Sequence, residues 1–247
     1  MILEILSYYW LPILFVAIGS YLIGGINASI LVTKVLNPGH DIRDVGSGNA
    51  GFTNVLRTQG IKMGVITFAI DFLKVIMAVW FSDIIFSIFR VNLIGNNFPI
   101  EIFLKYLTCL MCVIGHMFPC FFDFKGGKSI LVAWSSMLLI DWRIFLILIS
   151  VFLITLLFTK IVSLSSINAA VILPIAAFVC DYFVDYKRTG NILVMWIPLI
   201  FCIVISSVVI IKHRGNILRI IKGEEKKLCI NKTFKGGSKW NLIQYIL

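Results

Sequence analysis

Long apolar segments separated by short polar ones make up most of this chain. The apolar segments number seven: Ile5–Thr33, Met63–Ser82, Tyr106–Phe122, Ser129–Ile140, Ile144–Thr159, Ile161–Cys180 and Asn191–Ile211. A helix needs roughly 20 residues to cross the hydrocarbon core of a bilayer. The segments show no strand-like alternation, and lipid offers backbone amides no hydrogen bonds. The pattern therefore predicts an all-α integral membrane protein with seven transmembrane helices.

Composition supports a membrane protein. Sixty per cent of the 247 residues are hydrophobic and 14% are charged, whereas about a quarter are charged in a soluble domain. The first residues, Met1–Glu4, carry an acidic side chain where a cleaved signal peptide has basic ones. We expect the first apolar segment to remain as a membrane span.

Ser129–Ile140 is the shortest predicted span. Twelve residues of helix cover about 18 Å of a hydrocarbon core near 30 Å. If this segment alone failed to cross, every later segment would reverse its orientation. It should therefore cross together with Ile144–Thr159 or fail together with it, which leaves five helices as the alternative to seven.

Basic residues predict the orientation. With the N-terminus outside and seven spans, 16 of the 22 Lys and Arg residues fall in the inside segments 34–62, 123–128, 159–163 and 212–247. Basic residues are enriched in cytoplasmic loops. We therefore expect the N-terminus outside and the C-terminus in the cytoplasm. The domain organisation would be one membrane domain, 1–225, followed by a basic cytoplasmic tail, 226–247.

The first polar segment on the predicted inner face is rich in glycine. Residues 46–57 read Gly-Ser-Gly-Asn-Ala-Gly-Phe-Thr-Asn-Val-Leu-Arg. Glycines let backbone amides approach an anion, Ser47, Asn49 and Thr53 add polar groups, and Arg57 offers a fork that matches phosphate. A surface turn whose Ser and Asn cap a helix explains the same residues equally well.

Three further segments lie on the same predicted face. Residues 124–129, Phe-Lys-Gly-Gly-Lys-Ser, suit a phosphate but lack the spacing of a Walker A loop. His213 and Asn216 follow the last span, and His213 could exchange a proton near neutral pH. The hydroxyls of 159–166, Ser166 among them, could line the same pocket. In each case a basic collar or a helix cap is the alternative.

Neither a metal site nor a disulfide framework is expected. The six cysteines lie almost entirely in predicted spans, where free Cys behaves as a small hydrophobe. Cys109, Cys112, His116 and Cys120 resemble metal ligands in spacing, but on one helix they extend over roughly 16 Å. Asp71 and Lys74, three residues apart in a span, should pair with each other or a partner in the bundle interior as a structural contact.

Three motifs together resemble the bacterial acyl-phosphate:glycerol-3-phosphate acyltransferase family. They are Gly-Ser-Gly-Asn-x-Gly-x-Thr-Asn-x-x-Arg at 46–57, Gly-His-x-Phe-Pro with Phe-Lys-Gly-Gly-Lys at 115–128, and Lys-His-Arg-x-Asn-Ile at 212–217. The resemblance covers residues from about 20 to 225. It implies seven membrane helices with the motifs on the cytoplasmic side, and no metal or nucleotide cofactor.

The resemblance also implies roles for the motif residues. Catalysis would fall to Ser47, Arg57, His213 and Asn216, and substrate or phosphate binding to Asn49, Thr53, Gly126, Gly127, Lys128 and Ser166. Glu225 would be structural. Four positions depart from the family pattern: Phe52 for Ala, Ser129 for a third Gly, Lys160 for Arg and Glu224 for Thr. Residues 231–247 match nothing in the family.

The implied activity is an acyl transfer in phospholipid biosynthesis at the bacterial inner membrane. Acyl phosphate would donate a fatty acyl group to glycerol 3-phosphate, giving lysophosphatidic acid and phosphate. The His-x4-Asp dyad of other glycerol phosphate acyltransferases is absent, because Val45, Phe121 and Leu218 stand five residues after the three histidines. The implied partners are membrane lipid and a soluble phosphate acyltransferase that makes acyl phosphate, with no nucleic acid.

Two other classes of protein agree less well with this sequence than an enzyme does. A small phosphate transporter or anion channel would place polar groups near the bilayer midplane and use paired interrupted helices. Here the glycines and charges gather at one membrane face. A non-catalytic anchor for lipid-synthesis enzymes would leave the Ser, Asn, His and Arg of three loops unexplained.

Overall fold

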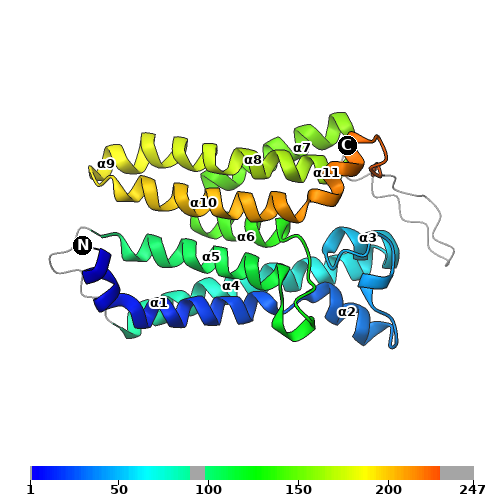
Figure 1. Cartoon of the computed structure of the whole chain (residues 1–247), viewed down its shortest axis with the longest axis horizontal. Helices are drawn as coiled ribbons and strands as arrows, with labels where there is room; N and C mark the ends of the chain where they lie inside the picture. Colours follow the sequence, from blue (N-terminus) through cyan, green and yellow to red (C-terminus); the bar gives the residue numbers. More distant parts are fainter. Residues whose placement is uncertain (1, 90–97, 229–247) are drawn as a thin grey trace.

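The chain folds into a bundle of long helices that lie side by side (Figure 1). The computed structural model describes residues 2–89 and 98–228. Its helices are α1 Ile2–Gly25, α2 Ala28–Leu36, α3 Phe52–Gln59, α4 Ile61–Ile88, α5 Ile100–Met117, α6 Ile130–Ile140, α7 Trp142–Thr159, α8 Val162–Cys180, α9 Lys187–Thr189, α10 Leu193–Lys212 and α11 Arg214–Ile221. Short turns complete it: the 3₁₀ turns η1, Ile42–Asp44, and η2, Cys120–Phe122, and the π-helical turn η3, Asp181–Tyr186.

The described residues contain six helical segments long and apolar enough to cross a membrane. They confirm an all-helical membrane architecture and match six of the seven predicted spans. The remaining span, Ile130–Ile140, is an 11-residue helix. The predicted ends differ most in three helices: α4 continues to Ile88 rather than Ser82, α5 begins at Ile100 rather than Tyr106, and η3 and α9 extend α8 to Thr189.

The short α6 and its neighbour α7 leave one end of the bundle and return to it. Lys128, just before α6, contacts Asn216 at the start of α11, and Ser163, just after α7, contacts Glu225. Asn216 and Glu225 in turn contact each other. The two helices therefore form a hairpin whose two outer ends both contact the segment 216–225.

The first predicted span is interrupted at Ile26 and Asn27. The Asn27 side chain caps α2 by accepting a hydrogen bond from the amide of Ile30, at 3.1 Å. The carbonyl of Ile26 accepts a hydrogen bond from Lys74 Nζ, at 2.8 Å. A side-chain cap and a buried ammonium thus satisfy backbone groups that the break releases.

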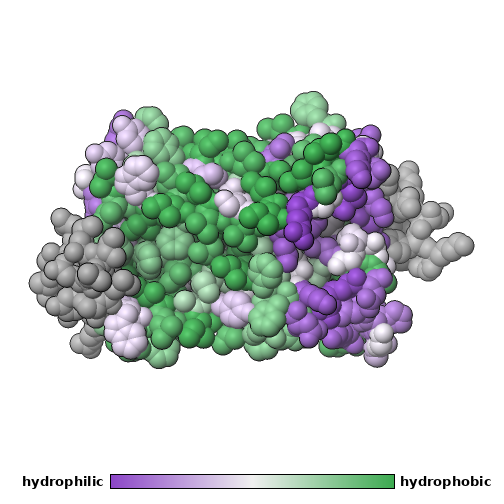
Figure 2. All heavy atoms as spheres, in the orientation of Figure 1, coloured by the Kyte–Doolittle hydropathy of each residue, from purple (hydrophilic) through white to green (hydrophobic). Residues whose placement is uncertain are grey.

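Apolar side chains fill the bundle and also cover its outside. The largest buried cluster joins α4, α5, α6, α8 and α10 through residues such as Val75, Met117, Met137, Ile205 and Val209. On the face seen in Figure 2, apolar residues cover the middle of the molecule, while hydrophilic residues gather at the end that holds α2, α3 and α11. This distribution suits lipid around the apolar middle and water at the polar end.

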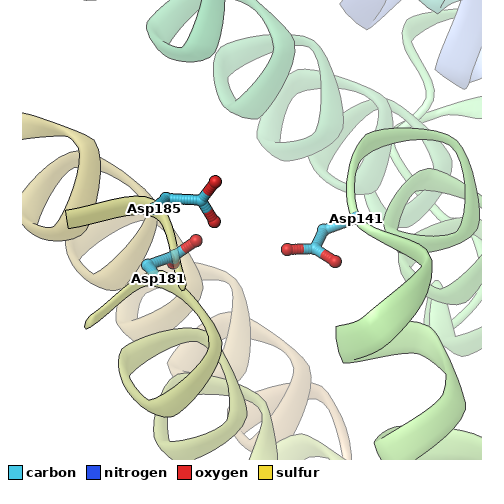
Figure 3. Close-up of side chains that lie close together, drawn as sticks. All are labelled: Asp141, Asp181 and Asp185. Atoms are coloured by element: carbon cyan, nitrogen blue, oxygen red, sulfur yellow. The ribbon is translucent and has the colours of Figure 1, made fainter. Parts of the chain in front are cut away.

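An acidic cluster lies where the α6–α7 turn meets η3. The carboxylates of Asp141, Asp181 and Asp185 face one another (Figure 3), with one ligand oxygen from each within 4.8 Å of the others. Arg143 Nη2 contacts Asp141 Oδ2 at 2.5 Å and Asp185 Oδ2 at 2.6 Å. Arg188 adds a contact to Asp185 at 3.2 Å. Because a guanidinium bridges two of the three carboxylates, we interpret the cluster as a structural contact that joins the α6–α7 hairpin to η3 at the end of α8.

Candidate active site

The glycine-rich segment 46–57 is held in shape by a buried asparagine. Asn54 Oδ1 accepts a hydrogen bond from the Ser47 amide at 2.9 Å, and Asn54 Nδ2 donates to the carbonyls of Ile42 and Val45. Asn54 is 2% exposed. Sequence reasoning did not select Asn54, although it stands beside Thr53 in the motif. Its contacts leave the Ser47 side chain exposed at the polar end of the bundle.

The other predicted residues of this segment are accessible from the polar end. Asn49 and Thr53 are partly exposed, and Arg57 is exposed one turn further along α3. Arg43 braces the preceding turn, because it pairs with Asp41 and donates to the carbonyl of Phe122 at 3.0 Å. Segment 46–57 is thereby attached to the turn that leads into Gly126.

Gly126 and Gly127 lie against the end of α5 and the first segment. The amide of Gly126 donates to the Met117 carbonyl and that of Gly127 to the His116 carbonyl, both at 3.1 Å. A Cβ on Gly126 would lie 2.0 Å from His116 O, and a Cβ on Gly127 would lie 2.4 Å from the carbonyl oxygen of Ala50. Only glycine fits this close approach of backbones, which brings the first and second motifs together.

Lys128 connects the second motif to the third. Its Nζ donates a hydrogen bond to Asn216 Oδ1, and Asn216 Nδ2 donates to Glu225 Oε1 at 2.7 Å. Ser163 Oγ also donates to Glu225 Oε1, at 2.8 Å, and Arg219 Nε donates to Oε2 at 2.7 Å. Ser163 thus meets Asn216 and Arg219 at one carboxylate, and Lys128 joins this network through Asn216.

Glu225 and Ser163 have a larger part in this network than the sequence indicated. Burial raises the pKa of the Glu225 carboxyl, but the hydrogen bonds from Ser163, Asn216 and Arg219 outweigh it, so the pKa lies below its usual value. The predicted Ser166 is buried, and its Oγ bonds the Val162 carbonyl in its own helix at 2.9 Å. The hydroxyl that joins the network is thus three residues earlier.

His213 is buried beside this network with one ring nitrogen fixed. Its Nδ1 lies 2.8 Å from the Val209 carbonyl, which can only accept a hydrogen bond, so Nδ1 carries the proton and Nε2 the lone pair. Burial lowers the pKa of His213 to about 4, and the Lys128 charge adds to the effect. The imidazole is therefore neutral at pH 7 and able to accept a proton at Nε2.

Lys128 has an unusually acidic ammonium. Burial lowers its pKa to about 8, and the nearby charge of Arg219 acts in the same direction. The folded protein still carries the charge at pH 7, because this pKa lies above 7. The ammonium is available to an anion and is lost in mildly alkaline solution.

Lys128 should limit the reaction at alkaline pH. We expect kcat/KM for the phosphorylated acceptor to fall as pH rises above about 8, while kcat at saturation changes little, since kcat/KM reports ionisation of the free enzyme. Lys128→Arg should move the fall to higher pH, because a guanidinium stays charged. Steady-state rates between pH 6 and 10 measure this. An unchanged profile in Lys128→Arg would contradict it.

Known proteins are similar to this chain in both sequence and fold. The family model described as glycerol-3-phosphate acyltransferase matches residues 14–223. The glycerol-3-phosphate acyltransferase of Clostridioides difficile is 34% identical over 226 residues, which cover 92% of this chain and 98% of that protein. The one from Finegoldia magna is 38% identical over 224 residues, covering 90% and 98%.

Two solved structures have the same fold. They are crystal structures of PlsY (YgiH), an integral membrane glycerol 3-phosphate acyltransferase, in its glycerol 3-phosphate form and its lysophosphatidic acid form. The first gives a TM-score of 0.68 at 33% identity and covers 88% of this chain and 96% of that one. The second gives 0.66 at 30% identity, covering 88% and 95%. The chain therefore belongs to the glycerol-3-phosphate acyltransferase family and is an integral membrane acyltransferase of the PlsY type.

Proposed function

We propose that this acyltransferase moves a fatty acyl group from acyl phosphate to glycerol 3-phosphate. The products are 1-acylglycerol 3-phosphate and inorganic phosphate. The observation that supports this best is the meeting of Lys128, Asn216 and Glu225 beside His213, with the Gly126–Gly127 backbone and the Ser47 segment on the same face. Two phosphorylated reactants repel each other, and the basic side chains of the site offset that repulsion.

The chemistry that the chain offers supports acyl phosphate as the donor. Acyl phosphate is a mixed anhydride, so its carbonyl carbon is already activated and phosphate leaves readily. The enzyme then mainly has to position the glycerol hydroxyl, which can supply several kcal/mol of the barrier. The sequence has no His-x4-Asp dyad of the kind used by other glycerol phosphate acyltransferases. Both points favour acyl phosphate over a thioester donor.

The proposed step forms one ester bond and breaks one anhydride bond. The glycerol hydroxyl oxygen attacks the carbonyl carbon, and the bond from that carbon to the phosphate oxygen breaks. The hydroxyl proton passes either to His213 Nε2 or to a phosphate oxygen that His213 orients. We assign catalytic roles to Ser47, Arg57, His213 and Asn216, and phosphate or substrate binding to Asn49, Thr53, Gly126, Gly127, Lys128 and Ser166.

We propose that the acyl chain enters the bundle at a small apolar hollow beside Val209. Ile130, Ala133 and Trp134 of α6 line it, with Leu148 of α7, Ala169, Ala170 and Leu173 of α8, and Val209 of α10. Val209 is also the residue whose carbonyl holds His213. We place the first part of the acyl chain here, because the lining is apolar and includes the residue whose carbonyl holds His213.

A larger side chain in this hollow should impair a long-chain acyl donor more than a short-chain one. Ala133 is 5% exposed and lines it from α6, so Ala133→Leu should reduce kcat/KM for palmitoyl phosphate about tenfold relative to acetyl phosphate. The ratio of the two donors is the measurement, because a folding defect lowers both equally. Equal losses for both donors would place the chain elsewhere.

We propose that the polar end faces the bacterial cytoplasm. Seven spans, with α6 counted among them, put the N-terminus outside and the C-terminus inside, and the charge bias supports this orientation. A soluble acyl-phosphate-producing enzyme would then supply the donor from the same side. The predicted boundary between the membrane domain, 1–225, and the tail, 226–247, stays a proposal, since residues 229–247 lie outside the described part.

Phosphate release tests the proposed reaction. Purified protein is given palmitoyl phosphate and glycerol 3-phosphate without metal or CoA, and Ser47→Ala is compared with Ser150→Ala, an exposed serine on α7. We expect acceptor-dependent release by the wild type and Ser150→Ala, and a loss of about a hundredfold in Ser47→Ala. No release by folded wild-type protein, with activity on palmitoyl-CoA instead, would overturn the proposed donor.

A further inference from the structure

Three buried side chains form a polar chain beneath the Gly126–Lys128 loop. Lys74 Nζ lies 2.6 Å from Asp71 Oδ1 and 2.9 Å from His116 Nδ1. Asp71, Lys74 and His116 are 1%, 2% and 4% exposed. The expected pairing of Asp71 with Lys74 is confirmed. The contact with His116 connects it to the Gly-His-x-Phe-Pro motif, which a purely structural pair in the bundle would not require.

The distances determine which nitrogen of His116 carries the proton. The Lys74 ammonium can only donate, so His116 Nδ1 accepts and the ring hydrogen must be on Nε2. The alternative, Nδ1–H donating to Asp71, is disfavoured because that distance is 3.6 Å. The ion pair between Asp71 and Lys74 thus fixes the imidazole as a donor through Nε2.

The donor nitrogen faces the site where two motifs meet. A Cβ on Gly127 would lie 2.4 Å from His116 Nε2 and equally close to the Ala50 carbonyl oxygen, so both groups border the same α-carbon. Asn27 Nδ2 already donates to that carbonyl, at 3.3 Å. The amide of Gly127 donates to the carbonyl of His116 itself. His116 therefore contacts the loop through its backbone and its ring.

We propose that His116 is a positioning residue for acceptor binding. Its ring, oriented by Lys74 and Asp71, borders Gly127 with its Nε2–H and so holds the Gly126–Lys128 loop in the shape that receives the phosphate of glycerol 3-phosphate. This inference rests on the proposed assignment of that loop to the acceptor phosphate. It gives the Asp71–Lys74 pair a role in substrate affinity that reaches from the middle of α4 to the polar end.

Two amide substitutions separate the functions of the two ring nitrogens. His116→Asn keeps an acceptor near the position of Nδ1 for Lys74 but has no donor at Nε2. His116→Gln places its amide nitrogen closer to Nε2. With full-length protein in nanodiscs, we expect His116→Asn to raise KM for glycerol 3-phosphate about tenfold, with kcat within about twofold of wild type, because the loop loses the polar group that borders Gly127. His116→Gln should recover most of the affinity.

Controls distinguish the possible failures. Lys105→Ala, on the same helix in an exposed pair with Glu101, should leave KM unchanged. Lys128→Met should raise KM by itself; if it does not, the proposed loop assignment fails. If Lys128→Met raises KM while His116→Asn leaves it at the wild-type value, the positioning role alone is wrong. Equal KM values in the Asn and Gln variants, with lower kcat and thermal midpoint in both, would also overturn it.

Discussion

His213→Ala will lower kcat/KM at pH 7 by about a hundredfold or more, the usual effect of removing a general acid–base group. His213 is 2% exposed, and its Nδ1 is held by the Val209 carbonyl, so Nε2 is the nitrogen left for chemistry. Initial rates of phosphate release with both substrates varied give the change in kcat and in KM. We expect most of the loss in kcat.

The matched control is His40→Ala, which removes an exposed histidine outside the site.

The pH profile separates the two routes for the proton. Because the pKa of His213 is lowered to about 4, the imidazole is neutral above that pH, and an enzyme that uses it as base should lose activity only as pH falls toward 4. Activity of folded His213→Ala within threefold of wild type would exclude a catalytic role.

Gly126→Ala will also lower kcat/KM strongly, because it forces the Gly126–Lys128 loop to move. The added Cβ would lie 2.0 Å from the His116 carbonyl oxygen and 2.7 Å from Pro119 Cδ, and both belong to rigid parts of the chain. The loop must move, which displaces Lys128 from Asn216. We expect KM for glycerol 3-phosphate to rise more than tenfold, since a misplaced binding group costs affinity.

Gly215→Ala is the comparison for this substitution. Gly215 lies between His213 and Asn216, but a Cβ there meets only Arg219 Nη1, at 3.6 Å, an ordinary contact. It should bind glycerol 3-phosphate like the wild type and be slightly more stable, because alanine favours a helix. A wild-type KM in Gly126→Ala would show that the close approach does not shape the acceptor site.

Hydrophobic pattern and charge were sufficient to predict the helical membrane architecture. They identified the six long helices and the short Ile130–Ile140 helix, because each depends on the local length of an apolar segment. The break at Ile26–Asn27 was missed. It lies inside an apolar run, and the groups that stabilise it come from Lys74 and Ala50, far away in sequence.

The sequence predicted which residues belong to the site but not which of them contact one another. The motifs identified Lys128, His213 and Asn216, and the structure brings them together. Ser163 was expected only as one of the hydroxyls of 159–166 and Glu225 only as a structural residue, because their contact joins side chains 62 positions apart in the chain. Contacts between such distant segments depend on how the helices pack against one another. The residue types and their spacing within one segment do not determine that packing.

The departure at Ser129 from the family pattern has a simple structural explanation. Ser129 has a left-handed backbone, with φ of 59°, which glycine adopts without strain. Here the Ser129 side chain is buried, and its Oγ donates to the Val113 carbonyl at 2.8 Å. This hydrogen bond offsets the strain and attaches the start of α6 to α5.

The brevity of α6 has a consequence for the surrounding lipid. Its 11 residues rise about 16 Å, roughly half of a hydrocarbon core, while α4 beside it has 28 residues. Such hydrophobic mismatch is relieved by thinning the bilayer or tilting neighbouring helices, at a cost that depends on lipid chain length. An enzyme that makes a precursor of membrane lipids would then respond to the thickness of the bilayer it helps to build.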